Sequence, residues 1–372
     1  MDTTKKPVKI INKLYNDKEF SFQIQNCNVS IINAIRRTIL SDIDTIVVRT
    51  TPYEKNDADF IINTTRTHNE MLKHRLSCIP IHIKDTSIDL EDFVIECNEK
   101  NDTDTIRIIT TEHFKIKNIN TDNYLSSSQV KEIFPPDDFT KDYIIFTKLR
   151  PKLTELSSGE QIYFKAKMSI GNASEDSTFN VVSTCSYSFS PDKIKQDSKW
   201  NIVKQTLKDK GLNDEDIISE KQNWYLSDAK RIVLDDTFDF IIKSIGVFDN
   251  TDIIKKACNI INNSLTSIKT SSISKSITIK DSDVVMKSFD VTLDNVDYTI
   301  GKIIEYALYD NYYGPDNIFS FVGFSKQHPH DKFSIIRLAF SDTTKTQTNI
   351  YPFIEKSCDY LINIFESINS QL

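Results

Sequence analysis

Hydrophobic and polar residues alternate over residues 20–24, where three apolar side chains are separated by polar ones. This period of two is typical of a strand with one buried face. A helical pattern follows, with Asn28 or Ser30 available as N-cap. Its apolar side is broad and is formed by Ile31, Ile32, Ile35, Ile39, Leu40 and Ile43. The pattern therefore predicts a short strand followed by an amphipathic helix.

Two adjacent arginines lie in this predicted helix. Arg36 falls within the apolar side, whereas Arg37 points away from it. An arginine on an apolar face either extends its guanidinium to water or meets an acidic or carbonyl partner. Arg36 is therefore either a surface residue whose stem covers the apolar side, or part of a docking surface for another chain.

From residue 84 to residue 190 the pattern changes to short alternating segments. Candidate strands cover residues 93–96, 106–110, 143–147, 161–169 and 180–189. Loops rich in Asn, Asp, Ser and Pro separate them. We expect a β-rich subdomain here, followed over residues 191–229 by a polar arm that is partly helical.

A strand is predicted again over residues 238–245, and a helix follows it with Asn250 or Thr251 as N-cap. The apolar face of this helix includes Ile254, Cys258 and Ile261. Residues 266–276 are rich in Ser, Thr and Lys, which predicts a flexible linker and a domain boundary.

Residues 277–372 repeat part of this arrangement. A strand over 289–293 precedes an apolar helix, two strands cover 319–324 and 332–340, and a long amphipathic helix ends the sequence. The two halves thus show a weak internal duplication. We expect two modules, each a sheet with helices, that pair through Ile254, Cys258, Ile261, Ile303, Leu361 and Phe365.

The composition is that of a folded, acidic protein. The 372 residues are 39% hydrophobic and 10% aromatic, and the formal net charge is -7. No long run of basic residues occurs, which disfavours a broad nucleic-acid interface. The sequence contains no apolar run long enough to span a bilayer, and we expect neither a signal peptide nor a membrane span. The 6 cysteines form no Cys-x-x-Cys pair, which favours a reducing, intracellular compartment.

No metal site is predicted. Four possible ligands lie close together in the sequence but match no zinc spacing: His68, His74, Cys78 and His82. Asp57 and Asp59 are two residues apart, as in some Mg²⁺ sites, but no third carboxylate joins them. Phosphate-binding glycine loops and nucleophile motifs are also absent. From the residues alone we expect an α+β protein that is not itself an enzyme and needs no cofactor.

Three segments of the first half resemble a known signature. They are residues 33–40 (NAIRRTIL), 63–65 (NTT) and 74–81 (HRLSCIPI). Together they resemble the α-like assembly subunits of multisubunit RNA polymerases, a family that includes the bacterial alpha subunit, the archaeal D-type subunit and the third-largest subunit of eukaryotic RNA polymerase II. Residues 238–246 resemble the strand that precedes the dimerisation helix of that family.

The second half resembles the protein with which that subunit pairs, which is the archaeal L-type subunit or the eleventh subunit of the eukaryotic enzyme. The pattern of this L-like family is acidic-His-Thr-Leu-Gly followed by an apolar helix, and residues 297–301 here are DYTIG. Tyr298 and Ile300 differ from the usual His and Leu. Residues 321–325 (FVGFS), with His328-Pro329 after them, also fit the L-like family.

The resemblance implies an α+β fold in which two α-subunit-like dimerisation modules form an intramolecular pseudo-heterodimer, with a β-rich insertion domain in the first. The implied parts are residues 1–50 plus 230–268 for the first module, 51–190 for the insertion, 191–229 for the arm, 266–276 for the linker and 277–372 for the second module. Cellular enzymes keep the two subunits as separate chains. A fused chain resembles the arrangement in large DNA viruses.

The resemblance also implies a non-catalytic platform that assembles the two large catalytic subunits of a DNA-dependent RNA polymerase for transcription. The implied docking residues are Arg36, Arg37, His74 and Arg75. The partners would be the largest and second-largest subunits and the small zinc-binding subunits, with little or no contact with nucleic acid and none with a membrane. The location would be intracellular: the host cytoplasm in a viral factory and the virion, or the nucleus of a cell.

Many members of the family hold zinc or an iron–sulfur cluster in the insertion. This sequence offers only Cys97 and Cys185 there, so we predict no metal. Two other functions stay open. One is a metal-dependent nuclease or transferase that uses Asp57 and Asp59. The other is a freestanding transcription regulator that binds DNA through residues 191–229, against which the acidic net charge weighs.

Overall fold

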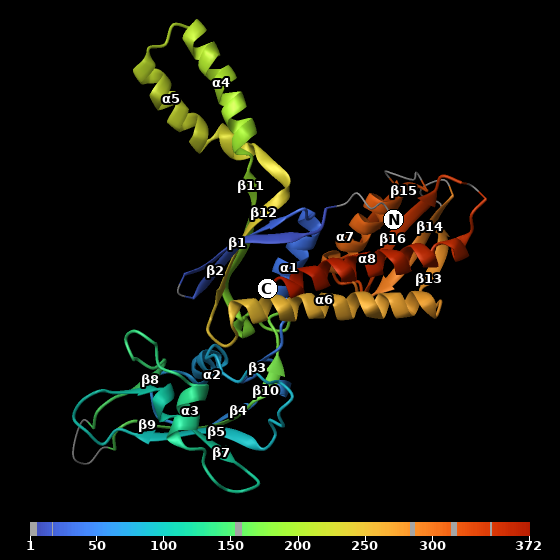
Figure 1. Ribbon diagram of the computed structural model, residues 1–372. Coiled ribbons are helices and arrows are strands. Elements are labelled where there is room, and N and C mark those ends of the chain that lie inside the picture. The colour runs from blue at the N-terminus through green and yellow to red at the C-terminus, as the bar shows by residue number, and fades with distance from the viewer. Residues whose placement is uncertain (1–5, 17, 153–157, 283–286, 314–317, 343) are drawn as a thin grey trace. The chain divides into compact units, whose positions relative to one another are not determined.

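The computed structural model describes residues 6–16, 18–152, 158–282, 287–313, 318–342 and 344–372 (Figure 1). Antiparallel sheets and helices give the chain an α+β fold. The chain divides into two compact units: unit 1 contains Met1–Thr38, Thr184–Lys243 and Ile254–Leu372, and unit 2 contains Ile39–Ser183 and Ser244–Ile253. No helix in the described ranges is both long enough and apolar enough to cross a membrane.

Unit 1 holds two four-stranded sheets, and the first has the strand order β1-β2-β12-β11. Its strands are β1 (Lys9–Asn16), β2 (Glu19–Gln25), β12 (Val233–Ser244) and β11 (Val182–Pro191). Strand β2 pairs antiparallel with both β1 and β12. The alternating apolar side chains of β2 are buried, which confirms the strand expected over residues 20–24.

The second sheet of unit 1 has the strand order β13-β14-β16-β15. Its strands are β13 (Thr278–Ser282), β14 (Ser288–Asp294), β16 (Phe333–Phe340) and β15 (Phe319–Ser325), and all neighbours are antiparallel. Helix α7 (Tyr298–Leu308) contacts β15 and β16 of this sheet and also helix α8 (Tyr351–Ser370).

Helices α6 (Asn250–Ile273) and α8 run side by side, and α6 belongs to unit 1 from Ile254 onward (Figure 1). The Asn369 side-chain amide donates to Asn259 Oδ1 at 3.5 Å, and Lys269 Nζ lies 2.5 Å from Asp359 Oδ1. Residue numbers therefore rise along one helix as they fall along the other. The two helices are antiparallel neighbours.

The flexible linker predicted over residues 266–276 is wrong for the residues up to Ile273, because α6 continues that far. Ile268 and Ser272 are buried at helical spacing, so packing holds this end of the helix. Two threonine hydroxyls donate to carbonyl oxygens four residues earlier, at 2.7 and 2.8 Å. Bonds of this kind occur within helices and leave both hydroxyls with a partner. We call the residues up to Ile273 the first half and the residues from 277 the second half.

Two helices form most of the polar segment expected over residues 191–229. They are α4 (Lys193–Asp209) and α5 (Asp214–Leu226), and they lie in the sequence between β11 and β12. Trp200 is buried, and its ring centroid lies 5.6 Å from that of Trp224. This aromatic contact holds the two helices together.

Unit 2 is rich in strands, with a sheet of order β4-β9-β5-β7 and the strand pairs β10-β3 and β6-β8. The strands are β3 (Thr45–Val47), β4 (Ala58–Asn63), β5 (Phe93–Lys100), β6 (Arg107–Thr110), β7 (Lys115–Asn118), β8 (Ile145–Leu149), β9 (Gln161–Lys167) and β10 (Ser169–Gly171). The helices are α2 (Asn69–Ser77) and α3 (Ser127–Ile133).

Short helical turns occur in both units. They are the 3-10 turns η1 (Tyr53–Lys55), η2 (Thr111–His113), η3 (Ser177–Phe179), η4 (Asp228–Arg231) and η6 (Gln347–Asn349), and the π-helical turn η5 (Tyr309–Tyr313).

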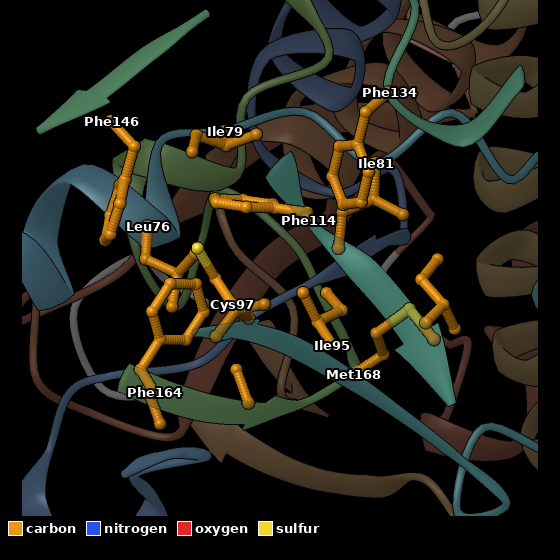
Figure 2. Close-up of a cluster of buried hydrophobic side chains, with 14 of the residues drawn as sticks. Leu76, Ile79, Ile81, Ile95, Cys97, Phe114, Phe134, Phe146, Phe164 and Met168 are labelled. Atoms are coloured by element: carbon orange, nitrogen blue, oxygen red, sulfur yellow. The ribbon is translucent and has the colours of Figure 1, made fainter. Parts of the chain in front are cut away.

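Aromatic rings form the centre of the unit 2 core (Figure 2). The Phe114 ring lies 5.5 Å from Phe134, 5.5 Å from Phe146 and 5.4 Å from Phe164, each in an edge-to-face arrangement. Such pairs add to the stabilisation that burial alone provides. The core therefore ties η2, α3, β8 and β9 together.

The limits of the units differ from the expected limits of the insertion, residues 51–190. Strand β3 precedes residue 51, yet it pairs with β10 inside unit 2. Strand β11 covers most of the strand expected over 180–189, but it joins the first sheet of unit 1. Alternation predicts that a strand exists, but it carries no information on the strand's neighbours.

Candidate docking site and junction between the halves

Helix α1 (Val29–Ser41) carries the two arginines that the sequence singled out. Arg36 is half-buried, and its Nε and Nη2 donate to Asn33 Oδ1 at 3.1 and 2.9 Å. Among the described residues its side chain has no other hydrogen-bond partner. Because a guanidinium carries five N–H donors, Arg36 keeps donors available for another chain. Its position on α1 is compatible with both interpretations given to it above.

Arg37 makes a contact that the sequence analysis missed. Its Nε donates to Thr299 Oγ1 at 2.8 Å, and its Nη2 lies 3.3 Å from Asp297 Oδ2. The Asp297 carboxylate also caps α7, because its Oδ1 accepts the Thr299 backbone N–H at 2.9 Å. Arg37 therefore links α1 in the first half to the start of α7 in the second half. No sequence spacing predicts a pair that is 260 residues apart.

Gly301 allows α7 to lie directly against the second sheet. A Cβ atom at this position would lie 2.0 Å from Cε2 of the Phe324 ring. Phe324 is itself held in place, because its backbone N–H donates to Glu305 Oε1 at 3.1 Å and its ring contacts Tyr298 edge-on. The glycine of the DYTIG motif thus has a packing role between α7 and β15.

The six residues predicted to pair the halves are all buried. Each is at most 1% exposed: Ile254, Cys258 and Ile261 on α6, Ile303 on α7, and Leu361 and Phe365 on α8. Together with the Arg37 contact, the α6–α8 pair forms what we call the junction between the halves. The direct pairing of these six side chains stays a prediction.

His74 and Arg75 lie on α2 in unit 2, whereas Arg36 and Arg37 lie in unit 1. Both α2 side chains are exposed, and Arg75 Nη2 donates to the Ile145 carbonyl oxygen at 2.7 Å. His68 caps the start of this helix by accepting the Glu70 backbone N–H. The single docking surface expected from all four residues stays a prediction.

The residues of the enzymatic alternative form strand-edge contacts. The Asp57 carbonyl oxygen accepts from the Lys167 backbone N–H at 2.9 Å, and Asp59 lies opposite Lys165 in the β4–β9 pair. Within the described ranges, no group of three or more His, Cys, Asp or Glu side chains is placed to hold a metal ion. The geometry therefore supplies no third ligand to these two aspartates.

Five of the cysteines are buried, and burial raises their thiol pKa values to about 12: Cys27, Cys97, Cys185, Cys258 and Cys358. A thiol with this pKa stays protonated at neutral pH, so it is a poor nucleophile and a poor metal ligand. Cys97 and Cys185 of the expected insertion are thus packing residues in this structure.

Residues 21–265 match the family model described as "RNA polymerase Rpb3/Rpb11 dimerisation domain". The chain belongs to this family. The match contains β11, β12 and most of β2 from the first sheet, together with α1 and most of α6, and it also contains unit 2. It ends before the second half. The Rpb3/Rpb11 dimerisation domain family comprises RNA polymerase assembly subunits of the α-like type, which confirms the resemblance of the first half at the family level.

Three curated proteins are similar in sequence to parts of the chain. The chain is 26% identical over 199 residues, which is 49% of this chain and 60% of the other, to a Tetrahymena thermophila protein named "Conjugation stage-specific protein". It is 27% identical over 186 residues to "DNA-directed RNA polymerase subunit Rpo3" of Methanosphaera stadtmanae, which covers 50% and 62% of the two chains. It is 22% identical over 275 residues to the Pyrococcus horikoshii protein of the same name, which covers 68% and 93%. The chain thus spans about three fifths of the first two relatives.

Proposed function

We propose that this chain is a non-catalytic assembly platform of a DNA-dependent RNA polymerase, in which an archaeal-D-like half and an archaeal-L-like half are fused. The observation that carries the proposal is the junction. A first half that belongs to the dimerisation family lies against a second half through an antiparallel helix pair and the Arg37–Asp297 contact. The motif at residues 297–301 supports the L-like assignment, because its glycine has the packing role described above.

Burial at the junction supports an intramolecular pseudo-heterodimer. Fully burying a side chain such as Leu361 or Phe365 stabilises a protein by about 1.5–3 kcal/mol. Several such side chains on α6, α7 and α8 would hold the halves together without a partner protein. The second half begins a few residues after α6 ends, so the two halves meet at high effective concentration.

The proposed partners are the largest and second-largest polymerase subunits, with the small zinc-binding subunits beside them. Arg36 has unused donors in a fork geometry that suits carboxylates and backbone carbonyls. His74 and Arg75 would extend the docking surface from α2. The net charge of -7 favours little or no direct contact with nucleic acid. No observation favours a nuclease, a transferase or a freestanding DNA-binding regulator.

A fused arrangement fits a large DNA virus as the source. The chain would then act inside the host cell, in cytoplasmic viral factories and in the virion. In a cellular organism it would act in the nucleus.

Purification of the tagged chain from its native source tests the proposal. We expect mass spectrometry to identify both large polymerase subunits among the co-purifying chains. Charge reversal by Arg36→Glu should reduce recovery of the second-largest subunit at least about tenfold, because it places a carboxylate where the partner meets a guanidinium. The isolated variant should keep its thermal unfolding temperature.

Lys148→Glu is the matched control, because it reverses an exposed charge on β8 at a residue that is not one of the four proposed docking residues. It should leave recovery unchanged. Unchanged recovery with Arg36→Glu would refute the docking role of that residue. Absence of both large subunits from the purified material would refute the platform function itself.

A further inference from the structure

Unit 2 contains a cavity of about 500 Å³ that none of the functions above explains. It is bounded by the turn η2, strand β7, helix α3 and the segment before β8. Its apolar lining includes the buried Phe114, Phe134 and Val130 and the more exposed Tyr124 and Tyr143, and a comparable part of the lining is polar. Pockets of this size that combine apolar walls with polar groups are typical of ligand sites.

The walls of this cavity are held in place before any ligand binds. Phe114 and Phe134 are buried, and their rings meet edge-to-face at 5.5 Å (Figure 2). The Tyr124 hydroxyl donates to Glu96 Oε2 at 2.7 Å, and Ser126 caps α3 through a capping box. A ligand would therefore bind without first ordering the site, which favours affinity.

One polar group that lines the cavity lacks a hydrogen-bond partner among the described residues. Thr111 is 1% exposed, and its hydroxyl has no hydrogen-bond partner among the described residues. Buried polar atoms are nearly always hydrogen-bonded in native proteins, so such an exception calls for a missing partner. A peptide group that enters the cavity would supply one.

The charged residues at the cavity indicate the sign of the charge that a ligand would carry. Lys115 on β7 and Lys131 on α3 line it, both are exposed, and neither forms a salt bridge with a described residue. Among the described lining residues, the acidic one is Glu112. The cavity is thus locally positive in a chain whose net charge is -7. Two lysines over an apolar floor suit a carboxylate beside an apolar group better than they suit a nucleic-acid backbone.

We propose that this cavity binds a short acidic segment of a partner polypeptide. An aromatic or aliphatic side chain of the segment fills the space over Phe114 and Phe134, and neighbouring carboxylates meet Lys115 and Lys131. A backbone group of the segment forms a hydrogen bond with the Thr111 hydroxyl. The inference does not depend on the polymerase function, because it concerns a site on unit 2, whereas the junction residues belong to unit 1.

Fluorescence anisotropy with the full-length chain tests the proposal. The probes are three fluorescein-labelled peptides of the form Ser-Asp-Asp-X-Glu-Asp-Ser, where X is Phe, Leu or Trp. We expect at least one to bind with a Kd below about 1 mM. Replacing X by Ala, or the acidic residues by Lys, should weaken binding at least about tenfold.

Variants of the chain distinguish binding at this site from nonspecific binding. Lys131→Glu should weaken binding of the peptide at least about tenfold, and Thr111→Val should weaken it about threefold to tenfold. Lys148→Glu, an exposed lysine outside the lining, should change it less than about twofold. Thr111→Val should also raise the unfolding temperature, because it removes an unpaired buried hydroxyl. A raised unfolding temperature would show that the variant is folded.

Three results would overturn the proposal. The first is that no acidic peptide binds at about 1 mM. The second is that Lys131→Glu and Thr111→Val bind the peptide as the unchanged chain does. The third is that a labelled single-stranded oligonucleotide binds more tightly than the peptides and loses affinity with the same variants. The cavity would then be a nucleic-acid site.

Discussion

The replacement Gly301→Ala has two opposing effects on the stability of α7, because it improves helix propensity and disturbs packing at the same position. Alanine in a helix interior is about 1 kcal/mol more favourable than glycine, so propensity alone predicts stabilisation. The added Cβ, however, would lie 2.0 Å from the Phe324 ring. Carbon atoms normally approach to about 3.5–4.0 Å, so the ring must move by roughly 1.5 Å or more.

The expected outcome is a net loss of stability. Phe324 is 8% exposed and is held between Tyr298 and the α7 backbone, so it has little room to yield. Inserting a methyl group into such a core costs about 1–3 kcal/mol. With the propensity gain subtracted, the loss should reach up to about 2 kcal/mol.

Hydrogen exchange measured by mass spectrometry on peptides that cover α7 is the suitable assay. Two-state unfolding is an approximation suited to single domains, whereas local exchange reports the opening of one helix in a chain with two compact units. In the Phe324→Ala background, where the ring is absent, Gly301→Ala should instead stabilise α7 by about 1 kcal/mol. Stabilisation of this size with Phe324 present would refute the packing explanation.

Three further predictions concern the junction. Asp297→Ala should destabilise α7 by about 0.5–2 kcal/mol through loss of its cap. A double-mutant cycle with Arg37→Ala should give a coupling free energy of only about 0.2–1 kcal/mol, because both side chains are nearly half exposed. The coupling should fall in 1 M salt, which screens exposed charges. A coupling of zero at low salt would contradict the contact between Arg37 and Asp297. Phe365→Ala should cost about 3–5 kcal/mol in denaturant unfolding of unit 1, because the ring is 0% exposed. Glu366→Ala, on the exposed side of the same helix, should stay within about 0.5 kcal/mol, and equal effects of the two would refute the buried position of Phe365.

The periodicity of apolar residues correctly predicted helices and strands that bury one face in a hydrophobic core. Helix α8 was expected from its apolar stripe, and Leu361 and Phe365 in that stripe are fully buried. The alternating strand over residues 20–24 was predicted for the same reason. Composition was a weaker guide, because the Ser- and Thr-rich end of α6 stays helical where Ile268 and Ser272 pack inward.

Contacts between distant parts of the chain were beyond sequence reasoning. The sequence placed Arg37 on the polar side of α1, and the structure gives it partners on α7. Strand β11 was recognised as a strand, but its place beside β12 depends on the whole fold. Thr111 offered no signal at all, because an ordinary threonine becomes notable only when burial leaves its hydroxyl unpaired.

Cys78 is the exposed member of the 6 cysteines, and it caps the C-terminal end of α2 one turn after His74. The other five thiols are shielded within the fold. A maleimide dye added to the unmodified protein should therefore attach at this one position. The natural chain thus carries its own labelling site beside the proposed docking residues of α2, and a change in the dye's emission would report when a partner covers them.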